Sequence, residues 1–218
     1  MVLARRPLAR LALFALAFAA PALPGCASLP TEGVARGEAL YKNCVQCHGA
    51  DGQGSDLVHA PQIAGLPAWY VTAQVTHFQH GVRGAHPDDQ AGLKMRPMSR
   101  TLKSDADVAV VAEYVASLPH VKKDAKVEGD ATKGQAAFAT CAACHGADGA
   151  GNEALKAPPI RQLEDWYIAL QLGKFKAGVR GYDSSDAQGA QMAGIAKGLP
   201  DQVAMNDLAA YIQTLPAQ

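Results

Sequence analysis

The sequence predicts an all-α protein of 218 residues that is built from two tandem copies of one domain. Three observations lead to this fold class. The chain aligns with itself at an offset of 97 residues without a gap, and each copy contains three helix-like stretches. No segment shows the alternating apolar and polar pattern of a half-buried strand.

Residues 1–26 have the pattern of an export signal. Arg5, Arg6 and Arg10 precede an apolar run from Leu11 to Pro24. This run of 14 residues is shorter than the roughly 20 that span a bilayer. An uncleaved membrane anchor is the alternative, and the short run counts against it. The sequence therefore predicts export to the bacterial periplasm.

Cys26 lies at the end of this segment, within LPGCASLP. Leu23 and Gly25 resemble a bacterial lipobox, in which Cys26 is lipidated and associates the protein with the membrane, although Pro24 departs from that motif. The alternative is ordinary cleavage after Ala27. Neither route leaves Cys26 as a free thiol in the mature fold.

The charge balance excludes one class of partner. The chain has 20 basic and 20 acidic residues, and removal of the signal leaves 17 basic residues and a formal charge of −3. A mildly acidic protein is not expected to bind nucleic acid. Basic or dipolar proteins are compatible with it.

The duplication extends over most of the chain. CVQCHGADGQG at 44–54 returns as CAACHGADGAG at 141–151, and GVRG at 81–84 returns unchanged at 178–181. We define the first repeat as residues 33–119 and the second repeat as 131–217, each the size of a small domain. Residues 120–130 are charged and nearly free of large apolar side chains, which is typical of an exposed linker.

Three helices are predicted in each repeat. They span 32–43, 67–81 and 105–118 in the first repeat, and 130–140, 164–178 and 201–215 in the second. Asp105 and Asp201 are candidate N-caps of the last helices, and Pro119 and Pro216 follow their ends.

The duplicated Cys-x-x-Cys-His motif is typical of covalent haem c attachment. Two thiols add to the haem vinyl groups, and the spacing lets the histidine reach the iron from the same short segment. We predict two covalently bound haem c groups, held by Cys44, Cys47 and His48 and by Cys141, Cys144 and His145. A zinc site needs four ligands, and a redox dithiol favours a βαβ context that is missing, so both alternatives are disfavoured.

The second iron ligand is predicted from the repeat. Only Met95 and Met192 match each other among the candidate methionines, because Met98 aligns with Ile195 and Met205 with Val108. The five further histidines of the chain align with residues that are not expected to bind haem in the same way; they are His59, His77, His80, His86 and His120. Two His/Met sites are therefore predicted. Met98 is kept as a rival to Met95, a His/His site in one repeat is an alternative, and Met98 and Met205 are otherwise expected to fill the core.

Together these residues resemble the dihaem cytochrome c4 family over residues 33–217. The resemblance rests on CVQCHG and CAACHG, on WY-x3-Q-x3-F-x2-GVRG in both repeats, and on M-x6-L before the last helix. Gln162 departs from it, where the first repeat has Gly65. The resemblance implies two class I cytochrome c domains related by a pseudo-two-fold axis, with haem propionate edges that face each other.

The resemblance also implies roles for recurring residues. The carbonyls of Pro61 and Pro158 would accept hydrogen bonds from the ligating histidines, although both are also explained as ordinary loop prolines. A second group is singled out by its recurrence in both repeats and not by the resemblance. These residues could brace the propionates or the domain interface, with simple core packing as the alternative for the aromatic ones; the group is Trp69, Tyr70, Arg83, Trp166, Tyr167 and Arg180.

The predicted function is electron transport by a periplasmic carrier that is not an enzyme. The resemblance implies a quinol–cytochrome c reductase or a dehydrogenase as donor and a terminal oxidase as acceptor. The alternative is the cytochrome subunit of a periplasmic dehydrogenase complex. A dihaem enzyme ranks behind both, because it requires an open iron or a distal cysteine, and methionine at the sixth position leaves no open site.

Overall fold

The structure is a computed structural model that describes residues 30–216. The predicted export signal and Cys26 therefore lie outside the described residues. The regular elements within the described range are helices, with two isolated β-bridges and no strand, and this confirms the all-α prediction. No helix between residues 30 and 216 has the length and apolar character needed to cross a membrane.

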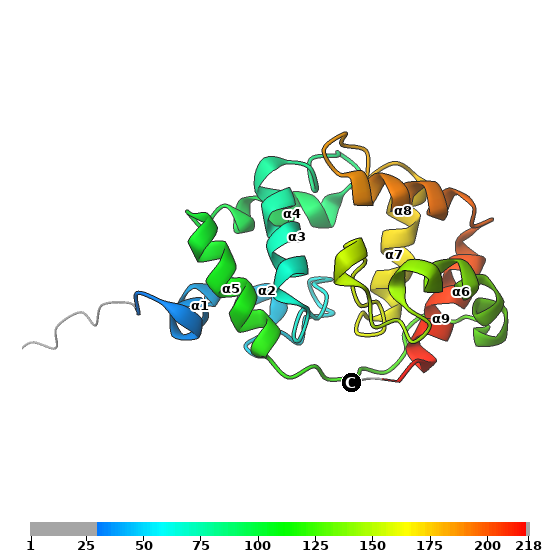
Figure 1. The fold of residues 1–218 in the computed structure, drawn as a ribbon, viewed down its shortest axis with the longest axis horizontal. Coiled ribbons are helices and arrows are strands. Elements are labelled where there is room, and N and C mark those ends of the chain that lie inside the picture. The colour runs from blue at the N-terminus through cyan, green and yellow to red at the C-terminus, as the bar shows by residue number, and fades with distance from the viewer. Residues whose placement is uncertain (1–29, 217–218) are drawn as a thin grey trace, which may run out of the picture.

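Each repeat contributes one set of helices to the fold (Figure 1). The first repeat forms α1 (Gly33–Tyr41), α2 (Val45–His48), α3 (Ala68–His80), α4 (Gln90–Ser99) and α5 (Asp105–Ser117). The second repeat forms α6 (Ala131–His145), the 3₁₀ helix η1 (Glu153–Leu155), α7 (Asp165–Lys176), α8 (Ala187–Lys197) and α9 (Gln202–Thr214). The three helices predicted in each repeat are present, with ends shifted by a few residues.

Helices α4 and α8 were not predicted, and they occupy equivalent positions in the two repeats. Helix α4 starts after Asp89, whose carboxylate accepts from the Gly92 N–H at 2.9 Å. Helix α8 starts in the same way after Asp186, which accepts from the Gly189 N–H at 2.8 Å. These caps satisfy main-chain donors that the first turn of a helix leaves free.

The N-cap prediction is half correct. Asp201 caps α9, since its carboxylate accepts from the Ala204 N–H at 2.9 Å. Asp105 does not cap α5 but is its first residue, and the Ser104 hydroxyl accepts from the Asp107 N–H instead. Ser104 is the residue that aligns with Asp201 at the offset of 97.

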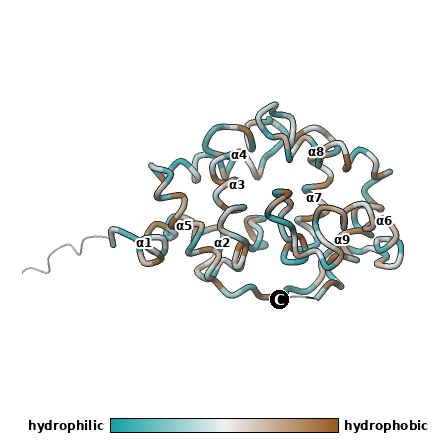
Figure 2. The backbone as a smooth tube through the Cα atoms, in the orientation of Figure 1, coloured by the Kyte–Doolittle hydropathy of each residue, from teal (hydrophilic) through white to brown (hydrophobic). Residues whose placement is uncertain are grey.

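The helices of each repeat cross in the same way. Helix α1 packs on α5 as α6 packs on α9, and both crossings are so close that only glycine fits at the contact. A Cβ added at Gly37 would overlap the main chain of Val110, and one at Gly134 would overlap that of Asp207. Hydrophobic and hydrophilic residues are interspersed along the helices (Figure 2). Helices α5 and α9, for example, each combine exposed residues with a buried set that packs in the core cluster.

The segment 120–130 connects the repeats without forming a helix. It runs along one edge of the molecule from the end of α5 to the start of α6 (Figure 1). It is nevertheless anchored to the second repeat. The N–H groups of Lys126 and Val127 donate to the buried Asp165 carboxylate at 2.6 and 2.7 Å, and the His120 ring lies 2.9 Å from the Gln162 carbonyl oxygen.

Candidate functional site

The two Cys-x-x-Cys-His motifs end in buried histidines with the same partner. His48 is the last residue of α2, and its Nδ1 donates to the Pro61 carbonyl oxygen at 2.9 Å. His145 ends α6, and its Nδ1 donates to Pro158 at 2.8 Å. This confirms the predicted proline contacts. Since Nδ1 carries the proton, Nε2 is the nitrogen that remains for a metal.

Burial keeps these two imidazoles in the neutral form that binds iron. It lowers the pKa of both His48 and His145, although the hydrogen bonds to the proline carbonyls act in the opposite direction. A neutral imidazole with a fixed ring orientation is the usual state of a metal-binding histidine.

The cysteines do not have the character of a redox pair. Burial, together with the neighbouring Cys47, raises the pKa of the Cys44 thiol to about 11. Redox-active cysteines instead have a lowered pKa, because the thiolate is the reacting form. The free thiols here stand for the thioether sulfurs of an attached haem.

A cavity of about 500 Å³ lies against the first motif. Its wall includes Cys44, Cys47 and His48 of the first motif and Met95 from α4. Native domains are close-packed, so a largely apolar cavity of this size is a ligand site. The structure thus brings the four predicted residues of the first site to one cavity.

Met98 lines the same cavity as Met95, one helical turn further along α4. Met98 was expected to fill the core; its side chain is 39% exposed beside this cavity and lies outside the buried core cluster. The corresponding expectation for Met205 is confirmed, because its side chain is buried in the core cluster. Met95 and Met98 both remain placed for the first site.

In the second repeat the predicted residues lie on α6 and α8. Cys141 and Cys144 precede His145 in the last turns of α6, and Met192 lies on α8. Cys141 and Met192 are half-buried and pack against the same core cluster. Helix α8 packs on α7 as α4 packs on α3, so Met192 occupies the position equivalent to Met95.

The second repeat completes the wall of the first cavity. Trp166, Tyr167, Gln171 and Lys174 from α7 line it together with the residues of the first repeat. Two of the buried donors in this wall have no hydrogen-bond partner within residues 30–216, namely Trp166 Nε1 and Arg83 Nε. Buried donors of this kind require an acceptor, and the haem propionates supply anionic oxygen atoms. The wall therefore fits a haem.

Four side chains form a reciprocal cluster between the repeats. Arg83 donates to Gln74 of its own repeat at 2.8 Å and to Gln171 of the other at 3.1 Å. Arg180 donates to Gln171 and to Gln74, both at 2.9 Å. Each arginine also lies over a phenylalanine ring of its own repeat. Of the roles expected for the arginines, contact across the interface is thus confirmed.

Two further contacts join the repeats, and each is made by residues at equivalent positions. His59 meets the edge of the Trp166 ring, and Lys156, its equivalent, lies over the Trp69 ring. His59 and Lys156 are also the described non-glycine residues with positive φ, at 53° and 55°. The pairing of equivalent positions confirms the expected pseudo-symmetry.

A third contact between the repeats also occurs in two equivalent copies, but the two copies differ in their residues. Lys174 Nζ donates to the buried Asp89 carboxylate at 2.5 Å. The equivalent pair is His77 and Asp186, whose atoms are 4.0 Å apart. Burial lowers the pKa of His77 although Asp186 acts to raise it, so this second pair lacks a permanent cation.

Acid is expected to weaken the interface through Asp89. Burial acts to raise the pKa of Asp89, but the Lys174 ammonium and the Gly92 N–H outweigh it and hold the pKa below its usual value. The stability from Asp89 is therefore complete above the unfolded-state pKa of about 3.9 and is lost as the pH falls through the lower folded-state pKa. Thermal melts of Asp89→Asn should show a lower Tm than wild type at neutral pH and a flatter loss below about pH 4.

Asp186→Asn is the matched control for this prediction. Asparagine keeps the helix cap at both positions, so only the charge across the interface is removed. Because His77 is largely neutral at pH 7, we expect a smaller fall in Tm at that pH than for Asp89→Asn. Equal effects of the two substitutions would contradict the assignment of the stabilising charge pair to Asp89.

The extra histidines contact other protein groups or lie at the surface. His77, His86 and His120 lie beside Asp186, Asp88 and the Gln162 carbonyl, and His80 is exposed at the end of α3. His59 lines the first cavity, where its ring meets Trp166. The roles of Gln74 and Gln171 were not predicted, although both residues recur at the repeat offset. The roles of Glu164 and Lys174 were not predicted either.

Comparisons with known proteins agree with this geometry. The family model for cytochrome c matches residues 34–119 and again residues 131–216. A thiosulfate dehydrogenase electron acceptor from Stutzerimonas stutzeri (strain A1501) is 30% identical over 194 residues, which are 84% of this chain and 84% of that protein. The cbb3-type cytochrome c oxidase subunit CcoP from Rubrivivax gelatinosus is 35% identical over 153 residues, 62% of this chain and 44% of that subunit.

A solved structure shares both halves of the fold. The crystal structure of reduced recombinant cytochrome c4 from Pseudomonas stutzeri aligns with a TM-score of 0.67 and 26% identity, over 85% of this chain and 100% of that one. The chain belongs to the cytochrome c family and is a cytochrome c4-like electron-transfer protein with two tandem domains and two covalently bound haem c groups.

Proposed function

We propose that the protein is a periplasmic electron carrier in which each haem iron is held between a histidine and a methionine. The proposed ligands are His48 and Met95 in the first repeat and His145 and Met192 in the second. The observation that carries this proposal is the cavity at which the first motif and Met95 meet, together with the equivalent placement of Met192. The proposed attachment thiols are Cys44 and Cys47, and Cys141 and Cys144.

The haem supplies a reversible one-electron couple when bound, and the chain sets its conditions. The buried histidines fix the ring orientation through the proline carbonyls. Methionine as the second ligand would raise the reduction potential and would leave no open coordination position for a substrate. We therefore propose a carrier and not an enzyme, with residues 33–119 and 131–217 as the two domains and 120–130 as their linker.

The reciprocal cluster suits transfer between the two sites. Two buried guanidinium groups, Arg83 and Arg180, have amide and phenol oxygens as partners in place of carboxylates. Buried charges need compensation, and propionates from both haems would provide it at this interface. We propose that Arg83 and Arg180 would bind the propionates of the two haems at this interface, which would hold the two redox groups close enough to exchange electrons between the repeats.

The proposed acceptor is a terminal oxidase, and the proposed donor is a quinol–cytochrome c reductase or a dehydrogenase. The similarity to an oxidase subunit supports the acceptor. A second candidate function is electron acceptance within a periplasmic dehydrogenase complex, which the similarity to a thiosulfate dehydrogenase electron acceptor favours. Stable co-purification with a dehydrogenase subunit would separate the second function from the first. Membrane association through a lipidated Cys26 is compatible with either.

An absorption spectrum of the oxidised protein tests the proposed ligands. We expect the weak far-red band of an iron–methionine bond with the intensity of two haems, and low-spin signals throughout. High-spin signals, or a band with the intensity of one haem, would contradict the assignment of methionine to both sites.

A further inference from the structure

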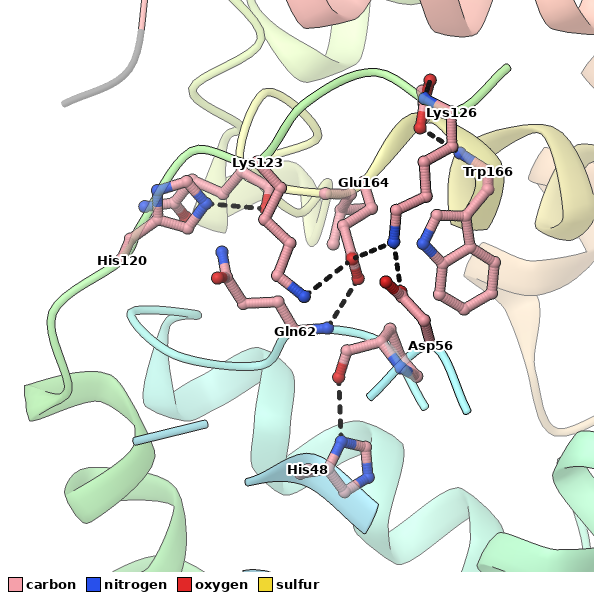
Figure 3. A network of polar contacts seen from close by, with 12 residues as sticks. His48, Asp56, Gln62, His120, Lys123, Lys126, Glu164 and Trp166 are labelled. Carbon is pink, nitrogen blue, oxygen red and sulfur yellow. Dashed lines mark hydrogen bonds and ion pairs between the residues drawn. The ribbon is translucent and has the colours of Figure 1, made fainter. Parts of the chain in front are cut away.

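A buried carboxylate of the second repeat lies against the peptide group that holds His48. Glu164 Oε2 accepts a hydrogen bond from the Gln62 N–H at 2.8 Å. The carbonyl of that same peptide group belongs to Pro61, and it accepts from His48 Nδ1 at 2.9 Å. Figure 3 shows the resulting chain of two hydrogen bonds from Glu164 through Gln62 to His48.

A peptide group can transmit the effect of this charge. Its C–N bond is partly double, so that a negative charge at the N–H shifts electron density toward the carbonyl oxygen. A more negative oxygen is a better acceptor for His48 Nδ1–H, and linked hydrogen bonds strengthen one another in this way inside proteins. Stronger hydrogen bonding at Nδ1 makes the imidazole a more basic ligand.

The second repeat cannot form the same chain. Pro158 accepts from His145, but the next residue is Pro159, whose nitrogen carries no hydrogen. The residue equivalent to Glu164 is Pro67, which has no carboxylate. Both ends of the contact are therefore absent from the second repeat.

The linker moderates the charge on Glu164. Lys123 Nζ donates to Glu164 Oε1 at 3.0 Å, and Lys126 Nζ lies 3.9 Å from the same oxygen. Lys126 also pairs with Asp56 of the first repeat (Figure 3). The Oε2 atom that faces Gln62 is a different oxygen, so the two lysines and the peptide share one carboxylate.

We propose that Glu164 tunes the haem of the first repeat by lowering its reduction potential through the Pro61–Gln62 peptide, and that Lys123 opposes this effect. The oxidised iron carries one more positive charge than the reduced iron, so a more basic ligand and a nearby anion both stabilise the oxidised form. The haem of the second repeat lacks this term. An electron on the first repeat is thereby biased toward the second repeat. The proposal rests on the proposed His48 and His145 ligands.

Redox titration of Glu164→Gln tests the proposal. Glutamine retains an acceptor for the Gln62 N–H and removes the charge. Haem methyl resonances followed by NMR at intermediate reduction levels give the potential of each haem. We expect a rise for the first haem by about three- to tenfold in its reduction equilibrium, the upper end being about 59 mV for a one-electron couple, and no change for the second. Lys123→Gln should shift the first haem in the opposite direction.

Two controls separate the peptide route from general effects of charge. Asp165→Asn removes the neighbouring buried carboxylate, which binds the linker N–H groups and does not contact the Gln62 peptide. It should leave the first potential nearly unchanged. Gln62→Pro copies the second repeat, and in that background Glu164→Gln should lose most of its effect, whereas Gln62→Ala retains the N–H and should retain the effect.

The outcomes that overturn the proposal are specific. An unchanged first potential in Glu164→Gln, an equal shift of both haems, or shifts of the same sign in Glu164→Gln and Lys123→Gln would each exclude it. An undiminished effect in the Gln62→Pro background would exclude the peptide as the route. Failure of the proposed function has a different signature, because the wild-type spectrum would then lack the far-red band of two iron–methionine bonds.

Discussion

Replacement of Met95 by alanine is expected to remove one of two iron–methionine bonds. The far-red absorption should fall to about half, and the potential of the first haem should fall by on the order of 0.1 V or more, because methionine ligation holds it high. Absorption spectra and redox titration measure both effects. Met192→Ala should produce the same loss at the second haem.

Met98 provides the matched control, because it lines the same cavity from the same helix. Met98→Leu should leave the far-red band and both potentials unchanged, since leucine keeps the apolar volume. If Met98→Leu removes the band and Met95→Ala does not, Met98 is the ligand and the repeat alignment is misleading at this position.

Loss of the first haem is expected to unfold the first repeat. In Cys44→Ala/Cys47→Ala the haem is not attached, and the cavity of about 500 Å³ lacks its occupant. Loss of one large buried side chain already costs about 3–5 kcal/mol, and a haem is larger than any side chain. A whole domain is stabilised by only about 5–15 kcal/mol. We expect loss of the cooperative thermal transition of this repeat and rapid proteolysis within residues 33–119.

The comparison must be made at known haem content, because haem can also be held without covalent bonds. The protein should be washed until one haem per chain remains, and its thermal unfolding should then be measured. A Cys141→Ala/Cys144→Ala variant treated in the same way is the control. Native-like helix content and an unchanged Tm in the washed first variant would show that the repeat folds without its haem.

The duplication made much of the site predictable from sequence alone. A single Cys-x-x-Cys-His motif predicts one ligand of an iron. Two aligned copies of it reduce the candidates for the second ligand to Met95 and Met192 among the methionines. The same offset predicts that contacts come in equivalent pairs, such as Arg83 with Gln171 and Arg180 with Gln74. It also identifies Ser104 as the equivalent of Asp201, and strict use of the offset would have placed the cap of α5 correctly.

Helices α4 and α8 were missed because their sequences resemble loops. Helix α4 contains Gly92 and Pro97 and few apolar residues, and α8 contains two glycines. Their formation depends on the caps at Asp89 and Asp186 and on packing against α3 and α7. The repeated Asp-x-x-Gly pattern at equivalent positions was the available signal.

Glu164 could not be found from the sequence. The first repeat has no acidic residue at the equivalent position, and the partner of Glu164, Gln62, is 102 residues away along the chain. Its significance arises from tertiary contact alone. An acidic residue before a helix is already explained by the helix dipole, so its presence gives no reason to expect a contact with the other repeat.

The reciprocal cluster of Arg83, Arg180, Gln74 and Gln171 has the form of an isologous dimer interface, in which one patch meets a copy of itself. In a homodimer every substitution appears on both sides, so the two haems would remain identical. Covalent fusion of the copies removes that restriction. The second repeat can then have Lys174 where the first has His77, and Pro159 where the first has Gln62. The symmetric cluster holds the two repeats together, while the differences between them allow the two haems to have different reduction potentials.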